Sequence, residues 1–121
     1  MKVLITGGAG YLGTVLTEEI LNRFPHAKVI IYDNLMYKQD GLFSFFKYPK
    51  DRFEFVYGDV RDKNSLLKQL QKLDKNNDYV IPLAAIVGFP ACARDEKLAV
   101  AVNFEHVKYI VQSTKCRIIY P

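Results

Sequence analysis

The chain has 121 residues, 50% apolar and 25% charged, a balance that favours one folded domain and excludes disorder along its whole length. The formal charge of +4 comes from lysines and arginines scattered among carboxylates, so we expect no nucleic-acid partner. No apolar run approaches the ~20 residues that cross a bilayer, and no secretion signal follows Met1. We therefore expect a cytoplasmic protein without a membrane span, whose two cysteines are reduced.

The first part of the chain alternates strand-like and helix-like stretches. Residues 2–6 form a β-branched run, and apolar residues then recur at helical spacing from Leu12 to Phe24. Two further apolar runs, at residues 28–33 and 53–57, predict the second and third strands. The alternation predicts strands that are separated by connecting segments long enough for crossovers.

The middle of the chain is less regular. The aromatic stretch 41–49 fits either a short helix or a packed loop. Asp62 is predicted to cap a helix. The apolar face of that helix consists of four leucines, Leu66, Leu67, Leu70 and Leu73.

The last part of the chain predicts a strand over residues 79–85, a long helix over 94–114 and a fifth strand over 117–120. The helix is apolar on most sides, so it needs cover on more than one face. Strands that read as continuous apolar runs between helices favour a parallel sheet covered on both faces.

Right-handed crossovers then predict the strand order 3-2-1-4-5, an α/β Rossmann-like doubly wound sheet that ends after its fifth strand. We expect residues 1–121 to form one such domain, incomplete because its last strand is left as an unpaired edge.

The most informative segment is TGGAGYLG, residues 6–13, between the first strand and the first helix. Its glycines fit the spacing Gly7-x-x-Gly10-x-x-Gly13, which permits a sharp turn and a close approach of backbone to a ligand. The amides and dipole of the following helix favour an anion there, such as a pyrophosphate. The alternative is a flexible surface turn.

Asp33 lies twenty residues after Gly13, at the end of the second strand, where a carboxylate can accept both hydroxyls of an adenosine ribose. The same charge would repel a 2′-phosphate by about 4 kcal/mol at about 4 Å and an effective dielectric near 20. This predicts NAD over NADP, although Lys38 is close enough in sequence to neutralise a phosphate. The alternative for Asp33 is a solvated loop acid.

Five motifs in order resemble the extended short-chain dehydrogenase/reductase superfamily, in particular its NAD-dependent nucleotide-sugar epimerase/dehydratase branch. The motifs are TGGAGYLG at 6–13, YDNL at 32–35, GDVRD at 58–62, PLAA at 82–85 and VN at 102–103. The resemblance covers essentially the whole chain and implies the Rossmann fold and an NAD cofactor.

The resemblance also implies a set of cofactor-binding residues. It places the pyrophosphate on Gly7, Gly10, Tyr11, Leu12 and Gly13, the ribose on Asp33 and Asn34, the adenine on Asp59 and Val60, and the nicotinamide side on Leu83, Ala84 and Ala85. Asn103 would support the active site by ordering water. From the residues alone, Asp59 is equally a turn residue, the alanines are equally core, and Asn103 is equally a satisfied core amide.

The sequence departs from the family pattern at three places. Pro82 stands where the family has His, and His106 where many members have Gly. No tyrosine is followed four positions later by lysine, so the family's Tyr-x-x-x-Lys pair is absent and we expect this chain alone to be inactive. The whole relative would oxidise a nucleotide-sugar carbon transiently with NAD.

Other readings of the same residues stay open. A non-catalytic dinucleotide sensor, or a reductase or dehydrogenase acting on a non-sugar substrate, would share every feature described above. The resemblance implies a homodimer through the helix at 94–114, or cover of that helix by a further C-terminal segment. We expect no metal site, and Cys92 is predicted to lie in the loop after the fourth strand, which would border the nicotinamide.

Overall fold

The computed structural model describes residues 1–121 and contains a five-stranded sheet in the order β3-β2-β1-β4-β5, with every neighbouring pair parallel. The strands are β1 (Lys2–Thr6), β2 (Lys28–Asp33), β3 (Phe53–Tyr57), β4 (Tyr79–Pro82) and β5 (Arg117–Ile118). The predicted Rossmann-like topology is confirmed.

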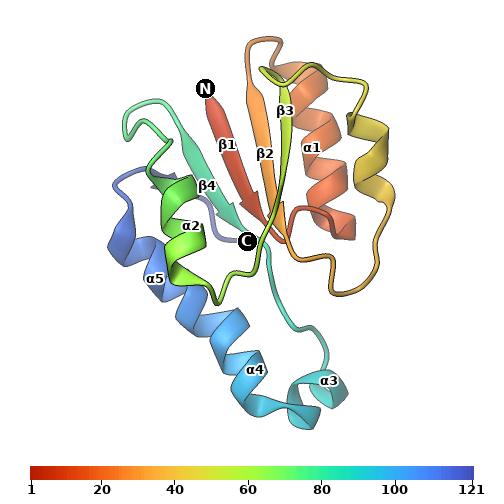
Figure 1. Ribbon diagram of the computed structural model, residues 1–121, viewed down its shortest axis with the longest axis vertical. Coiled ribbons are helices and arrows are strands. Elements are labelled where there is room, and N and C mark those ends of the chain that lie inside the picture. The colour runs from red at the N-terminus through yellow and green to blue at the C-terminus, as the bar shows by residue number, and fades with distance from the viewer.

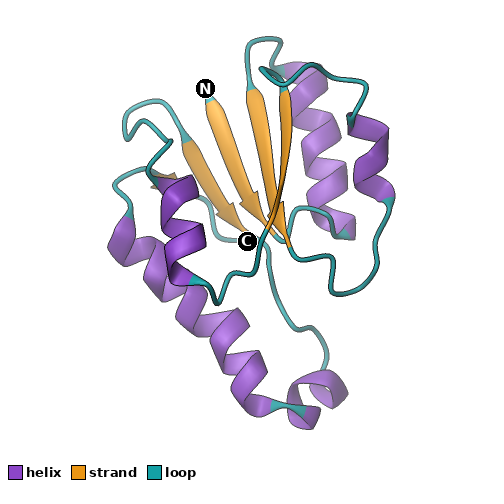
Figure 2. Ribbon diagram, viewed as in Figure 1, coloured by secondary structure: helices purple, strands orange, loops and turns teal.

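Helices cover both faces of the sheet (Figures 1 and 2). The helical elements are α1 (Tyr11–Arg23), the 3-10 turn η1 (Gly41–Phe45), α2 (Lys63–Leu70), α3 (Phe89–Arg94), α4 (Glu96–Val100), the π-helical turn η2 (Ala101–Glu105) and α5 (His106–Ser113). Figure 1 shows α1 on one side of the sheet and α2 and α5 on the other, while α3 and α4 project beyond the ends of the strands.

Alternate residues of the strands sort into two cores, as the pleat of a strand requires. Val3, Ile5 and Ile31 belong to a cluster of 12 buried residues that packs against α1 and η1. Leu4 and Ile30 belong to a second cluster of 12, which packs against α2 and α5. Since both faces are buried, the strands need apolar residues at successive positions, which is why their sequences show no alternation.

Two short segments adopt the local structures that their residues predict. The Asp62 carboxylate accepts a hydrogen bond from the Ser65 amide (3.0 Å) and caps α2. The aromatic stretch forms η1, whose Leu42 and Phe45 side chains are buried. No helix in the structure combines the length and the apolarity that crossing a membrane would require.

The fourth and fifth strands are shorter than predicted, and Pro82 explains the early end of β5. β4 ends at Pro82 rather than at Ala85, and β5 covers residues 117–118 rather than 117–120. The Ile119 amide still donates to the Val80 carbonyl (3.0 Å). The next bond of a parallel ladder would run from the amide of residue 82 to the Ile119 carbonyl, and proline has no N–H to donate.

The helix predicted over 94–114 is present as one helical run over residues 96–113, but this run begins after a break at Asp95 and contains a π-helical turn. Asp95 has an extended backbone (φ −147°, ψ 88°) that separates α3 from α4, and its carboxylate caps α4 at the Leu98 amide (3.0 Å). The π-helical turn η2 then separates α4 from α5. Cover is also one-sided, since Val102 and Ile110 are buried whereas Phe104 and Val111 are more than half exposed.

Candidate functional site

A cavity of about 630 Å³ opens at the carboxyl ends of the strands, where β1 is flanked by β2 and β4. This is the point at which the strand order reverses, the usual ligand position in open α/β sheets. Every residue named above for cofactor binding lines this cavity: Gly7, Gly10, Tyr11, Leu12, Gly13, Asp33, Asn34, Asp59, Val60, Leu83, Ala84 and Ala85, together with Asn103.

The glycine loop, residues 6–13, is packed so closely that side chains would not fit at two positions. Gly7 has a positive φ of 70°, and a Cβ atom there would lie 2.4 Å from the Ala84 amide nitrogen. A Cβ atom on Gly13 would lie 2.4 Å from the Gly8 carbonyl oxygen. The loop therefore needs these glycines for conformation and for contact with the segment after β4.

The N-terminus of α1 lies at the cavity and has no side-chain cap. Gly10 provides no side-chain hydrogen bond, and the first turn of the helix contains no acidic residue. The amides of Tyr11, Leu12 and Gly13 have no acceptor within the chain. Three unpaired donors and the positive end of the helix dipole thus meet in one place, an arrangement that binds anions.

Asp33 is fixed beside the glycine loop at the end of β2. Its carboxylate accepts hydrogen bonds from the Ala9 amide (3.0 Å) and the Leu35 amide (2.8 Å), and the residue is 8% exposed. Leu35 adopts a positive φ of 54° immediately afterwards. Asp33 is therefore a buried acid that faces the loop, and the alternative of a solvated loop acid is excluded.

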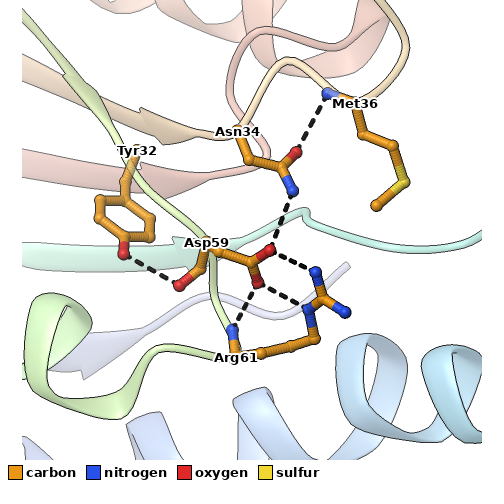
Figure 3. Close-up of polar contacts among 5 residues, drawn as sticks. All are labelled: Tyr32, Asn34, Met36, Asp59 and Arg61. Atoms are coloured by element: carbon orange, nitrogen blue, oxygen red, sulfur yellow. Dashed lines mark hydrogen bonds and ion pairs between the residues drawn. The ribbon is translucent and has the colours of Figure 1, made fainter.

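Asp59 is the centre of a polar network at the end of β3 (Figure 3). Its carboxylate accepts two hydrogen bonds from the Arg61 guanidinium, through Nε (2.9 Å) and Nη2 (2.6 Å). It also accepts one from the Arg61 backbone amide (2.9 Å) and one from the Asn34 side-chain amide (3.2 Å). Hydrogen bonding from the Arg61 side chain is the main cause that lowers the pKa of Asp59 to about 2. The carboxylate is therefore ionised throughout the physiological range.

The Tyr32 side chain holds the main chain of the segment that contains Gly58 and Asp59. Its hydroxyl donates to the Asp59 carbonyl or to the Ser65 hydroxyl, each 3.0 Å away, and its ring leaves no room for a Cβ atom on Gly58. Burial raises the pKa of the Tyr32 hydroxyl. Asp59 is thus a turn residue and also a cavity residue, and the two alternatives for it coexist.

The opposite wall is the β4 loop, residues 83–88. Leu83, Ala84 and Ala85 line the cavity, and Asn103 holds the next residue. The Asn103 side chain accepts from the Ile86 amide (2.7 Å) and donates to the Ile86 carbonyl (2.8 Å). Asn103 therefore provides hydrogen-bond partners for the backbone of this loop, as an adjacent strand would.

His106 joins the π-helical turn to the glycine loop. The His106 amide donates to the Ala101 carbonyl, five residues back. The ring nitrogen Nδ1 bonds the Val102 carbonyl, which in an α-helix would accept that amide, and Nε2 lies 3.3 Å from the Thr6 hydroxyl. His106 is 2% exposed, and burial lowers the pKa of its ring. His106 is therefore a neutral structural link.

The residues alone gave no signal for some of the cavity lining. Met36, Tyr37 and Gln39 follow β2 and line the cavity, and the Gln39 side-chain oxygen is buried without a hydrogen-bond partner. An unpaired buried acceptor favours a ligand that brings a donor. Only the polarity of Gln39 in an otherwise apolar and basic stretch could have suggested it.

Cys92 does not lie where the sequence predicted. It belongs to α3 rather than to a loop, its thiol donates to the Ile86 carbonyl (3.3 Å), and it is not among the residues that line the cavity. No three His, Cys, Asp or Glu side chains are grouped closely enough to hold a metal ion.

Comparison with known proteins identifies a family. Residues 3–119 match the model of the NAD dependent epimerase/dehydratase family. CDP-paratose 2-epimerase of Salmonella typhi is 38% identical over 72 residues, which is 60% of this chain and 21% of the relative. UDP-N-acetyl-alpha-D-glucosaminuronate decarboxylase of Bacillus cytotoxicus is 32% identical over 112 residues, which is 93% of this chain and 32% of the relative.

Solved structures give the same result. The chain superposes on the dTDP-glucose 4,6-dehydratase DesIV of Streptomyces venezuelae, solved with NAD and TYD bound, with a TM-score of 0.79 and 26% identity. The match covers 93% of this chain and 35% of that structure. The chain therefore spans about a third or less of the proteins that it resembles.

Proposed function

This chain belongs to the NAD-dependent epimerase/dehydratase family, and we propose that it is the NAD-binding part of a nucleotide-sugar epimerase or dehydratase. The observation that carries the proposal is the glycine loop: three unpaired amides at the N-terminus of α1 open onto a cavity beside the buried Asp33 carboxylate. Amides suit the anionic part of a dinucleotide, and a carboxylate suits its ribose.

The donor set fits the cofactor group by group. The amides of Tyr11, Leu12 and Gly13 would hold the pyrophosphate, with Gly7 and Gly10 allowing its close approach. Asp33 and Asn34 would hold the adenosine ribose, and Asp59 with Val60 the adenine. The β4 loop would place Leu83, Ala84 and Ala85 at the nicotinamide side, where small side chains leave space for a ring.

In the whole protein, we propose, bound NAD would supply reversible hydride transfer for the transient oxidation of a sugar carbon. This chain contributes the residues that bind and orient the cofactor, and Asn103 fixes the β4 loop that faces the reacting end. The chain lacks a Tyr-x-x-x-Lys pair, so alone it binds NAD and turns over no sugar. The names of its relatives support a nucleotide sugar as the substrate.

A second proposal concerns the apolar face that α4, η2 and α5 leave exposed. Val100, Phe104 and Val111 are each more than half exposed on this helical run. We propose that a second copy of the protein covers this face in a homodimer. Sedimentation of the chain and of a Phe104→Glu variant tests this, and a monomer at all concentrations would contradict it.

The compartment is a third proposal. Cys92 and Cys116 are both free, which suits a reducing environment such as the cytoplasm.

Calorimetric titration of the chain with NAD, NADP and ADP-ribose tests the main proposal. We expect NAD and ADP-ribose to bind and NADP to bind at least about tenfold more weakly, because a 2′-phosphate would lie against Asp33. Asp33→Ala should weaken NAD binding about 10- to 100-fold, since it removes charge-assisted hydrogen bonds.

Asp51→Ala is the matched control, because Asp51 is exposed and lies outside the cavity. This variant should bind NAD as the unmodified chain does. Equal affinities for NAD and NADP, or an Asp33→Ala variant that binds NAD normally, would contradict the assigned site.

A further inference from the structure

Thr6 is the residue at which the glycine loop leaves the sheet, and it is held from three sides. Its carbonyl accepts a hydrogen bond from the Leu83 amide (2.9 Å), and the amide of the following residue, Gly7, donates to the Tyr32 carbonyl (2.8 Å). Its side chain stands on the face of the sheet that α2 and α5 cover. Thr6 is 0% exposed, and its hydroxyl lies 3.3 Å from Nε2 of His106.

The two partners of the His106 ring determine which ring nitrogen carries the proton. The Val102 carbonyl can only accept, so Nδ1 carries the proton and donates to it. Burial lowers the pKa of the ring and keeps it neutral, so Nε2 has no proton and accepts from the Thr6 hydroxyl. The ring thus joins a carbonyl of the π-helical turn to the first residue of the glycine loop.

The glycine loop has few side chains that could hold its shape. Gly7, Gly8 and Gly10 contribute only backbone, and glycine loses more conformational freedom on ordering than any other residue. The order of the loop therefore depends on how firmly its ends are held. Amides that are ordered beforehand bind a ligand at a smaller entropic cost. His106 does not line the cavity, so any effect that it has on the anion site at α1 passes through Thr6.

We propose that His106 is a positioning residue of the cofactor site, which holds the glycine loop through Thr6 in the conformation that receives the pyrophosphate. The inference rests on the proposed function, because it concerns the same cofactor. It also sets this chain apart from the family pattern, since many members have glycine at this position and glycine has no side chain to reach Thr6. The bond should strengthen binding only for ligands whose phosphates contact the loop.

The test compares ADP, which has a pyrophosphate, with adenosine, which has none, by NMR titration of the chain. Thr6→Val removes the hydroxyl with little change in volume, and His106→Asn keeps a donor near the Nδ1 position but is too short to reach Thr6. Each should weaken ADP binding about three- to tenfold, the range of one neutral hydrogen bond, and adenosine binding less than about twofold. A general loss of stability would weaken both ligands equally, because it lowers the folded fraction.

Two conservative variants should restore the effect of the bond. Thr6→Ser keeps the hydroxyl, and His106→Gln places an amide near the Nε2 position, so both should bind ADP within about twofold of the unmodified chain. His26→Asn is the matched control, since His26 is exposed and lies outside the cavity. It should leave the affinities for both ligands unchanged.

Two results would overturn the proposal. One is a ratio of the ADP and adenosine Kd values that is the same in the unmodified chain, Thr6→Val and His106→Asn. The other is a ¹⁵N NMR spectrum of the His106 ring that shows the proton on Nε2 instead of Nδ1. Failure of the unmodified chain to bind ADP would instead refute the proposed function. Circular dichroism verifies the fold of each variant, and His106→Asn decides the matter if Thr6→Val does not fold.

Discussion

The glycine loop and the β4 loop meet at one cavity, but the chain builds them in opposite ways. The glycine loop is shaped by missing side chains: Gly7 and Gly13 allow backbone to touch backbone, and the amides at the start of α1 stay free. The β4 loop is shaped by a side chain from elsewhere, because Asn103 pairs with both the amide and the carbonyl of Ile86.

The difference shows where each wall is vulnerable. The glycine loop, made of closely packed backbone, should lose its conformation when a side chain is added to it. The β4 loop, held by a distant side chain, should lose its conformation when that side chain is removed. Three experiments test this contrast, and they are ordered by the size of the expected effect.

Gly7→Ala should have the largest effect, because it adds a side chain where the two walls touch. The new Cβ atom would lie 2.4 Å from the Ala84 amide nitrogen, on a residue whose φ is 70°. Strain and overlap together should cost at least about 3 kcal/mol of unfolding free energy. Urea unfolding followed by circular dichroism measures the loss.

Gly41→Ala is the control for that experiment, since its Cβ atom would meet only the Thr14 side chain, at 3.3 Å. It should change stability by much less than Gly7→Ala. Equal losses at the two positions would mean that the contact between the walls is not what requires glycine.

Asn103→Ala should have an intermediate effect, because it leaves the amide of Ile86 without a partner and leaves the Ile86 carbonyl with the Cys92 thiol alone. One unpaired, partly buried amide and one lost bond to the carbonyl should together cost about 1–3 kcal/mol. Hydrogen exchange at the Ile86 amide, which should become fast, localises the loss to the β4 loop.

Asn64→Ala is the matched control, because Asn64 is exposed in α2. It should leave both the stability and the exchange of Ile86 unchanged. Slow exchange at Ile86 in the Asn103 variant would show that the loop keeps its shape without this side chain.

Mild acid should have the smallest effect, acting through His106, which links the two halves of the cavity at Thr6. Burial lowers the pKa of His106 in the folded chain below its unfolded value near 6.5. The unfolded chain then binds the extra proton more readily, so the contribution of His106 is complete above about pH 6.5 and decreases as the pH falls below it.

Thermal unfolding at several pH values between about 5 and 7 measures this decrease, above the range in which ordinary carboxylates titrate. His106→Gln should flatten the profile. His26→Gln, which changes an exposed histidine, should leave it as it is. A profile that persists in the His106 variant would assign the pH dependence to another group.

The sequence predicted best what depends on neighbouring residues. The bounds of β1, β2 and β3 agree with the structure because each apolar run lies between clear breakers. The glycine spacing and its distance from Asp33 also predicted that the glycine loop and Asp33 line one cavity, whereas the other lining residues came from the family resemblance. These signals are local, so they can be read without knowing what packs against them.

The features that the sequence did not predict depend on distant partners. The early end of β5 follows from an N–H that Pro82 does not have, across two neighbouring strands. The bond between His106 and Thr6 joins residues 100 positions apart. The cap at Asp95 is different, because it lies one residue after the predicted start of the helix and can be recognised from the sequence.

The π-helical turn η2 has a consequence for how the chain tolerates changes in length. Such a turn is an α-helix that has absorbed one inserted residue, so the segments on either side keep their rotational phase. Deleting one residue between Ala101 and Glu105 should restore a straight helix with Ala99 and Ile110 still directed at the sheet. The deletion would return the Val102 carbonyl to the helix, so it would no longer orient the His106 ring. The contact between His106 and the glycine loop is therefore separable from the packing of the helix.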